Sequence, residues 1–372
     1  MAPEMDDDEY LVLRNDAGSS LDVLWHNPDV THVSVECEVP LSEKEYMSVF
    51  QSLAHHRKMT NLRVRCLQNA LPVAALSAVM NDPACRICDL TLEGICLAGK
   101  VQEYMAFIEA LRLCSLQHIR IDCCEFMNNH ISLDPFVRAL SSISTLESVY
   151  LADTEIAYDN KPWDCHYFSS LVSQIRSLEL NEMPDVYLEQ ICLLAQALEN
   201  QSCALKELTI QNQCLTTECI DRLAQMLQKN TSLEAVTIDV GSVEDVIAIA
   251  KSLQDPKQPC KIQRLSFPGD WGQANQGYNS DVRKALLEMV QSNNSIEKLS
   301  LGDDKSDLSI EMARYIKIKT DNRLASLALF GRSLTAKERR AECNLATAKS
   351  SKSNAAAAVG CGSASILLDW LK

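Results

Sequence analysis

Residues 204–239 read ALKELTIQNQCLTTECIDRLAQMLQKNTSLEAVTID, and this stretch decides the fold. Its first part, from Leu205 to Ile210, follows the pattern L-x-x-L-x-I, which predicts a short strand with its apolar side chains on one face. The apolar residues of 219–227 then recur three and four positions apart, as on an amphipathic helix. The strand pattern returns at Leu233. A strand and a helix of this size cannot bury their apolar faces alone, so the stretch predicts a stack of similar units.

The same unit recurs along the chain, with its first apolar position repeating every 28 to 30 residues and once after 34. The eleven positions are Val30, Met59, Ile87, Leu116, Leu146, Ile175, Leu205, Leu233, Ile262, Ile296 and Leu324. The pattern resembles the leucine-rich repeat, and a unit of this length with a full helix is similar to the ribonuclease-inhibitor type. The resemblance covers roughly residues 30 to 350. It implies an α/β solenoid, or horseshoe, of about eleven repeats with a parallel concave sheet and convex helices.

The ninth position of each unit departs from the pattern of that family. The family places Asn or Cys there, where the side chain satisfies backbone groups in the turn after the strand. In this chain Cys124 fits that role, and Thr154 and Gln213 fit it loosely. We therefore expect the other turns to be satisfied by other groups or to be less regular.

The chain divides into three parts by composition. Residues 1–29 predict an acidic arm, mobile to about residue 20, and an N-terminal cap that includes Trp25. Residues 30–350 form the predicted solenoid. Residues 351–372 combine a low-complexity linker with a short C-terminal apolar segment, which is either a cap or a tail that docks into a partner.

One repeat is longer than the others. Its excess lies in Gly269 to Asn279, which is rich in glycine, asparagine and glutamine. Insertions on one face of a solenoid are often contact loops, and the alternative is a tolerated loop with no contact of its own.

The balance of charge points away from nucleic acid and anionic membranes. The chain has 35 Lys and Arg against 50 Asp and Glu, for a net charge of −15. Such a charge repels phosphate backbones. The start of the chain is acidic and has no long apolar segment, and no stretch is long enough to span a membrane. We expect a monomer in the cytoplasm, or in the nucleus, whose partner is another protein.

The 16 cysteines invite a metal or disulfide interpretation, but their positions follow the repeat. Four of them lie two residues before a first apolar position, where free cysteine fills a small apolar site. Cys85 and Cys88 have zinc-like spacing, yet no second pair of ligands follows at a suitable distance. We expect no metal, no cofactor and a reducing compartment.

The third, fifth and seventh positions of each repeat point away from the core and line the exposed face of the sheet. On this face a basic cluster lies beside a tyrosine, and two glutamates follow on later strands. The seven candidate residues are Arg63, Arg65, His118, Arg120, Tyr150, Glu179 and Glu207. An arginine guanidinium can donate two parallel hydrogen bonds to a carboxylate, so the cluster predicts a site for an acidic segment of a partner. The alternative is that these charges only solvate an exposed sheet.

No catalytic constellation stands out, since the chain lacks G-x-x-x-x-G-K-[ST], G-x-S-x-G and H-E-x-x-H. We therefore expect a non-enzymatic platform that binds a partner protein through its concave strands. The alternative is a regulator of an enzyme, because similar repeat folds include GTPase-activating and enzyme-inhibiting proteins. This alternative is an analogy from the fold. The chain has no motif that would assign the functional residues of those proteins to positions in this sequence.

Overall fold

In the computed structural model the chain forms two compact units, Met1–Ile316 and Lys317–Lys372. The residues that the structure describes are 11–14, 26, 28–37, 41–126, 133–152, 165–182, 188–199, 203–211, 215–255, 261–268, 280–302 and 308–321. Several sequence predictions fall outside these residues. They are the predicted repeat at Leu324, the turn residues Thr154 and Gln213, Trp25, the insertion 269–279 and the C-terminal segment 351–372.

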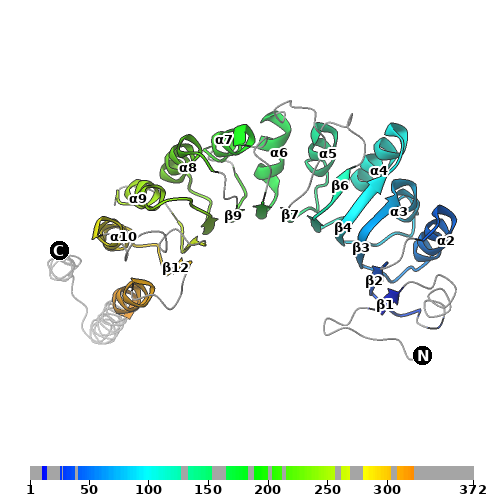
Figure 1. Cartoon of the computed structure of the whole chain (residues 1–372), viewed down its shortest axis with the longest axis horizontal. Coiled ribbons are helices and arrows are strands. Elements are labelled where there is room, and N and C mark those ends of the chain that lie inside the picture. The colour runs from blue at the N-terminus through cyan, green and yellow to red at the C-terminus, as the bar shows by residue number, and fades with distance from the viewer. Residues whose placement is uncertain are drawn as a thin grey trace, which may run out of the picture. The chain divides into compact units, whose positions relative to one another are not determined.

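Strands of the first unit form a single parallel sheet in chain order, except that β6 pairs with β4. Figure 1 shows these strands side by side. The strands are β1 (Leu11–Arg14), β2 (His32–Glu36), β3 (Asn61–Pro72), β4 (Asp89–Ala98), β5 (His118–Asp122), β6 (Glu125–Phe126), β7 (Ser148–Ala152), β8 (Ser177–Asn181), β9 (Glu207–Gln211), β10 (Ala235–Ile238), β11 (Arg264–Phe267) and β12 (Lys298–Leu301).

Helices alternate with the strands and lie on one side of the sheet (Figure 1). They are α2 (Glu43–Ala54), α3 (Val73–Met80), α4 (Val101–Leu113), α5 (Leu133–Leu140), α6 (Cys165–Gln174), α7 (Leu188–Leu198), α8 (Thr217–Lys229), α9 (Val243–Ser252) and α10 (Ser280–Ser292), followed by a helix over 308–321. The structure therefore confirms the α/β solenoid arrangement.

Polar residues fix where several helices begin. Ser42 caps α2, because its hydroxyl accepts a hydrogen bond from Glu45 N while its own N–H donates to the Glu45 carboxylate at 2.7 Å. Thr216 caps α8 through Cys219 N, and Ser242 caps α9 through Asp245 N at 3.2 Å. These caps fix the residue at which each of the three helices begins, and so help to maintain the register of successive units.

The predicted register is confirmed for ten of the eleven units. Each strand from β2 to β12, apart from β6, begins two residues after a predicted first apolar position. Leu208 of β9, for example, lies beside Leu178 of β8 and Val236 of β10. The side chains that the pattern assigned to the core are buried, and Leu178, Leu208 and Val236 are each 1% exposed.

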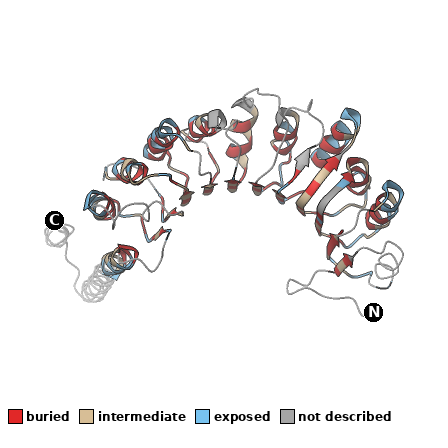
Figure 2. Ribbon diagram, in the orientation of Figure 1, coloured by how far each residue is buried: buried red, intermediate tan, exposed pale blue. Residues whose placement is uncertain are grey.

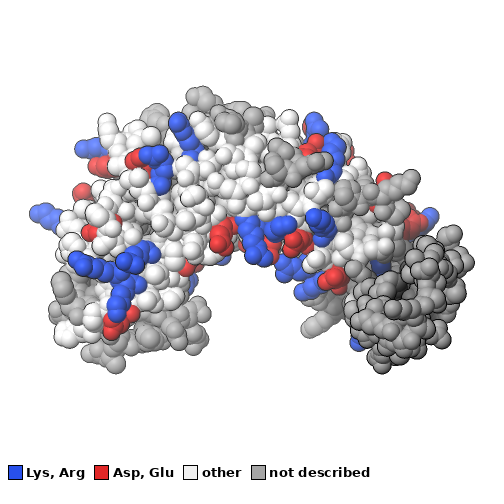
Figure 3. Space-filling view, turned by 180° about the vertical axis from the view of Figure 1, so that it is seen from behind, with Lys and Arg blue, Asp and Glu red and all other residues white. Residues whose placement is uncertain are grey.

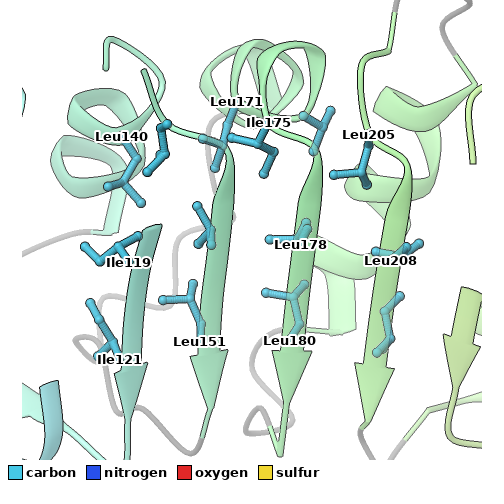
Figure 4. Packing of buried hydrophobic residues seen from close by; sticks show 14 of the residues in the cluster. Ile119, Ile121, Leu140, Leu151, Leu171, Ile175, Leu178, Leu180, Leu205 and Leu208 are labelled. Carbon is cyan, nitrogen blue, oxygen red and sulfur yellow. The ribbon is translucent and has the colours of Figure 1, made fainter. Parts of the chain in front are cut away.

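Leucine and isoleucine side chains form continuous columns between the sheet and the helices. Figure 4 shows Ile119 of β5, Leu178 of β8 and Leu208 of β9 at the same height, with Leu171 and Ile175 above them. In Figure 2 the buried residues lie between the two layers, and the exposed residues lie on the outer side of the helices. Burying each such side chain contributes about 1.5 to 3 kcal/mol before chain entropy is subtracted.

The N-terminal edge of the sheet differs from the prediction. Leu11–Arg14 form β1, which pairs in parallel with β2, and Leu11 and Leu13 are 1% and 3% exposed. The expected mobile arm to about residue 20 is therefore wrong at these four residues. Leu11 and Leu13 are two residues apart and so point to the same face, which is enough for an edge strand even beside an acidic segment.

Strands β3 and β4 run further than the repeat predicts. After a shift in register between Arg65 and Asn69, the two strands pair again from Asn69 to Pro72. Leu71 and Leu97 of this second segment are fully buried. Pro72 ends β3, and α3 follows at once. The extension lengthens β3 and β4, and β3 itself carries two of the candidate residues, Arg63 and Arg65.

Three units have a left-handed residue at their eighth position, within β4 in one unit and directly after β5 and β8 in the other two. Gly94, Cys123 and Glu182 have φ of 61°, 51° and 45°. Glycine adopts this conformation without steric cost, whereas in the other two residues the Cβ makes it less favourable. At Cys123 and Glu182 this conformation turns the chain away from the end of the strand.

Buried polar side chains satisfy backbone groups at three of the described turns. Cys124 is buried, and its thiol reaches Leu92 O on the preceding strand at 3.4 Å, as the family pattern predicts for this position. Asn230 acts at a different turn, between α8 and β10. Its amide donates to Leu198 O at 2.7 Å, and its oxygen accepts from Leu233 N at 2.8 Å. Asn293 repeats this arrangement between α10 and β12.

Candidate functional site

The register of the sheet brings most of the candidate residues together. Arg63 of β3 is aligned with Thr91, Arg120, Tyr150 and Glu179 on the following strands. Neighbouring strands lie about 4.8 Å apart, so long side chains in such a row reach one another. We call this surface the charged ladder, and its members are Asn61, Arg63, Arg65, Asp89, Glu93, His118, Arg120, Asp122, Tyr150, Glu179 and Asn181.

Glu93 is the centre of the charged ladder. Its carboxylate accepts a hydrogen bond from Arg63 Nη2 at 2.9 Å. Arg65 Nε and Arg120 Nε each lie 3.9 Å from the same carboxylate. The Glu93 side chain is 20% exposed, so its interaction with the three guanidinium groups is only partly screened by water.

Each cation of the predicted basic cluster has an acidic neighbour. Arg120 Nη2 donates to Asp122 at 2.6 Å, and His118 Nε2 lies 3.7 Å from Asp89. The cluster is therefore not a purely basic patch, because Asp89, Glu93 and Asp122 balance its charge. All three acidic residues occupy the third or seventh position of predicted strands, so comparing neighbouring registers could have found the pairing from the sequence.

Tyr150 joins the arginines to the acidic end of the charged ladder. The Arg120 guanidinium stacks over the Tyr150 ring, 3.7 Å from its centroid. Asn181 Nδ2 donates to the Tyr150 hydroxyl at 3.2 Å and to Glu179 at 2.9 Å. Burial raises the pKa of the Tyr150 hydroxyl, so this group stays protonated at neutral pH. Burial also opposes the charge of Arg120, but its hydrogen bond to Asp122 leaves its pKa raised.

Glu207 does not belong to the charged ladder. Its carboxylate accepts a hydrogen bond from Arg264 of β11 at 2.8 Å, and Ala235 of β10 lies between them in the register. The small alanine lets the arginine cross a whole strand. The side chains of Arg264 and Glu207 are 57% and 42% exposed, so solvent screens this pair more than it screens Glu93.

Side chains of both signs also gather in the space-filling view. Figure 3 shows Lys or Arg side chains next to Asp or Glu side chains along the inner, sheet-lined side of the first unit. Arg65 is the most exposed arginine of the charged ladder, at 48%, and its contact with the Glu93 carboxylate is long. Arg65 is thus well placed to meet a group from outside.

The described part of the chain holds no group of three or more His, Cys, Asp or Glu side chains placed to bind a metal ion. Cys85 and Cys88 have separate environments. Cys85 interacts with Cys114 of the next repeat, and the Cys88 thiol donates to Asp89 at 3.7 Å. Within the same described residues, no helix is both long enough and apolar enough to cross a membrane.

Comparison with known proteins identifies relatives that carry this repeat. No family model matches the chain. NACHT, LRR and PYD domains-containing protein 3 of Rattus norvegicus is 27% identical over 176 residues, which is 46% of this chain and 16% of the relative. NACHT, LRR and PYD domains-containing protein 9C of Mus musculus is 29% identical over 140 residues, or 37% and 13%. Together with the stacked units, they indicate a leucine-rich-repeat protein.

The extent of these matches limits what they show. The matched part of the chain spans about a sixth of the length of the first relative. Among solved structures, leiomodin-1 actin-binding site 2 covers 46% of the leucine-rich-repeat chain with a TM-score of 0.37 and 14% identity. The complex of Rad7 and Elc1 in yeast covers 78% with a TM-score of 0.31 and 13% identity. Both scores are too low to carry an argument about function.

Proposed function

We propose that this chain is a non-enzymatic platform that binds a partner protein through the charged ladder on the exposed face of its sheet. One observation carries the proposal. The ladder arranges three arginines, a tyrosine and several carboxylates in one connected, partly buried network before any partner arrives. Side chains that are already ordered lose little conformational entropy on binding.

The chemistry of the ladder favours a partner surface that carries both an acidic and an apolar group. Arg65 is about half exposed and can donate hydrogen bonds to a carboxylate of the partner protein. Tyr150 beside Arg120 offers an aromatic ring stiffened by stacking, and tyrosine and arginine are enriched among the residues that dominate binding energy. The carboxylates of the ladder would reject a partner that is acidic throughout.

Affinity capture from extract tests the proposal, with the intact chain compared with a variant carrying Arg65→Ala and Tyr150→Ala. A bound protein should be lost or reduced with this variant. The control is Arg112→Ala on α4, where the arginine pairs with Glu109 of its own helix. Calorimetry with the purified partner should then show at least a tenfold weaker Kd for the double variant, as expected when hot-spot residues are truncated. A Kd that is the same for all three forms would exclude the ladder as the binding surface.

The same experiment separates a platform from a regulator. If the captured protein is an enzyme, its turnover is measured with and without saturating leucine-rich-repeat chain. A platform leaves the rate unchanged, whereas a GTPase-activating or inhibiting protein alters it. In the platform proposal the chain itself performs no catalytic step, and its many thiols fit the cytoplasm as its compartment.

A further inference from the structure

A groove of about 780 Å³ lies where three neighbouring strands begin, beside Asn61 of the charged ladder. Thr31 and Thr60 line it just before β2 and β3, and residues 83–86 line it from the turn before β4. Main-chain hydrogen bonds hold the two threonine turns together, with Thr60 N donating to Thr31 O at 2.9 Å. Hydrogen-bonded main chain therefore joins two of the turns that line the groove.

The groove is positively charged in a chain of net charge −15. Arg57, Lys58 and Arg86 line it. Lys58 forms an ion pair with Asp29, but Arg57 and Arg86 are exposed and form no ion pair with any residue that the structure describes. Two arginines with open guanidinium groups are suited to bind carboxylates.

A thiol lies in the same groove. Cys85 is partly buried, lines the groove and shares a hydrogen bond with Cys114, which occupies the same position in the next repeat. The segments that carry them pair three residues further on, where Gln117 N donates to Cys88 O at 2.7 Å. Cα atoms joined by a disulfide are usually about 4.4 to 6.8 Å apart, which is close to the spacing of paired segments. The fold thus places Cys114 where it can form a bond to Cys85.

The local hydrogen bonds favour the thiolate form of Cys85. Donation from the Cys114 thiol, aided by Ile87 N–H, lowers the pKa of Cys85 to about 7, although burial and the nearby Asp82 oppose this. The Cys114 thiol also lies 3.4 Å from Met80 O, to which it can donate its hydrogen bond when Cys85 is protonated. Burial and the neighbouring Cys85 raise the pKa of Cys114, so Cys85 ionises first. A thiolate is the nucleophile of disulfide exchange.

We propose that Cys85 is a modification site that undergoes exchange with small disulfides bearing carboxylates, that Arg57 and Arg86 bind those carboxylates, and that Cys114 resolves the product. Glutathione disulfide is a ligand of this chemical class. The proposal is independent of the charged ladder and uses none of its residues.

The reaction has two balanced steps. The Cys85 thiolate attacks one sulfur of the small disulfide, the S–S bond of the ligand breaks, and one ligand thiolate leaves and takes a proton from water. Cys114 then loses its proton to solvent and attacks the Cys85 sulfur. This forms a Cys85 to Cys114 disulfide and releases the second ligand thiol. The two protein thiols are oxidised, and one small disulfide is reduced to two thiols.

Other cysteines provide internal comparisons. Cys123 is more exposed than Cys85, but its thiol lies 3.4 Å from the Asp122 carboxylate, which disfavours a thiolate and repels an anionic ligand. Cys124 is buried, and burial raises its pKa to about 12. If exposure alone governed the reaction, Cys123 would react before Cys85. The proposal predicts the opposite order.

The test treats the full reduced chain with glutathione disulfide, which is anionic, or with bis(2-hydroxyethyl) disulfide, which is neutral. Peptide mapping by mass spectrometry follows the rate at each cysteine. Cys85 should react before Cys123, and glutathione disulfide should be favoured at Cys85. In the Arg57→Ala, Arg86→Ala variant this preference should fall about tenfold, as expected when local attraction of an anion is lost. The matched control is Arg112→Ala with Lys284→Ala, which removes two arginine or lysine charges from helices outside the groove.

Two results would overturn the proposal. One is a reaction at Cys123 that precedes the reaction at Cys85. The other is a preference for the anionic disulfide that is the same in the arginine variant and in the control. The role of Cys114 is tested by Cys114→Ala, which should accumulate the mixed disulfide at Cys85. If that variant fails to fold, the unmodified chain still decides this point, since its mixed disulfide must decay into the Cys85 to Cys114 disulfide.

Discussion

The sheet face over β3 to β8 and the sheet face over β9 to β12 rest on the same core but carry different side chains. At the fifth position of the unit the first region holds Arg63, Thr91, Arg120, Tyr150 and Glu179, whereas the second holds only Thr209, Thr237, Ser266 and Ser300. The buried positions on either side are apolar in both regions. The comparison shows that the core sets the backbone, while the exposed column is free to differ and so to carry function.

The largest expected effect tests whether the two regions share one core. Leu92→Asp in β4 and Leu208→Asp in β9 should each lower the free energy of unfolding by more than about 4 kcal/mol, because each buries a charge and removes a packed side chain. Circular dichroism melts measure this effect. Thr209→Asp, one residue from Leu208 but on the exposed face, is the control. A melt of Leu208→Asp that superimposes on that of the unmodified chain would refute a shared core.

The next effect concerns how the second region closes its turns. Asn230→Ala should lower the free energy of unfolding by about 1 to 3 kcal/mol, because Leu198 O and Leu233 N lose buried hydrogen-bond partners. Asn81→Ala at the exposed end of α3, in the first region, is the matched control and should change little. Urea unfolding of both variants measures the difference. Equal losses would show that the buried amide has no special role.

A gain in stability is expected where the first region uses a strained turn. Glu182 has a φ of 45°, so Glu182→Gly should raise the free energy of unfolding by about 0.5 to 1 kcal/mol. Ser177→Gly in the extended strand β8 should instead lower it, because glycine loses more chain entropy there. Urea unfolding is again the measurement, and a loss on Glu182→Gly would mean that its side chain makes a compensating contact.

The smallest effect compares two of the acidic residues that pair with arginines on the sheet face, Glu93 and Glu207. Glu93→Gln weakens three interactions at a site of low exposure, and should cost about 0.5 kcal/mol, less at high salt. Glu207→Gln touches one exposed pair, so no measurable change is expected. Unfolding in urea at low and high salt provides the data. If both variants behave alike, the charged ladder is no more connected than an isolated surface pair.

Much of the fold could be predicted because the repeat averages over many units. Ten strand positions and the alternation of buried and exposed residues follow from Leu205, Leu208 and Ile210 and their equivalents. Features that occur once were missed. β1 is a single edge strand outside the repeat, and the added segment of β3 and β4 depends on a shift in register that no period contains.

The candidate site was predicted in part for a different reason. Six of its seven residues lie in the charged ladder, because alternation along a strand fixes which side chains point outward. The pairing of Arg63, Arg65 and Arg120 with one glutamate depends on side-chain reach between strands, and a search for basic residues alone overlooks the carboxylates between them. The role of Asn230 was not predicted because, among the described units, only Asn293 shares its residue type at that position of the helix-to-strand turn.

The parallel sheet in chain order also has a consequence for how the chain is made. Main-chain hydrogen bonds between strands join residues one repeat apart, as from Thr60 to Thr31 and from Glu297 to Gln263. Closing each loop therefore costs a similar, modest entropy, and no strand must wait for a distant part of the chain. During synthesis the first repeats can pair while the last are still on the ribosome, so the sheet can grow in the order of translation.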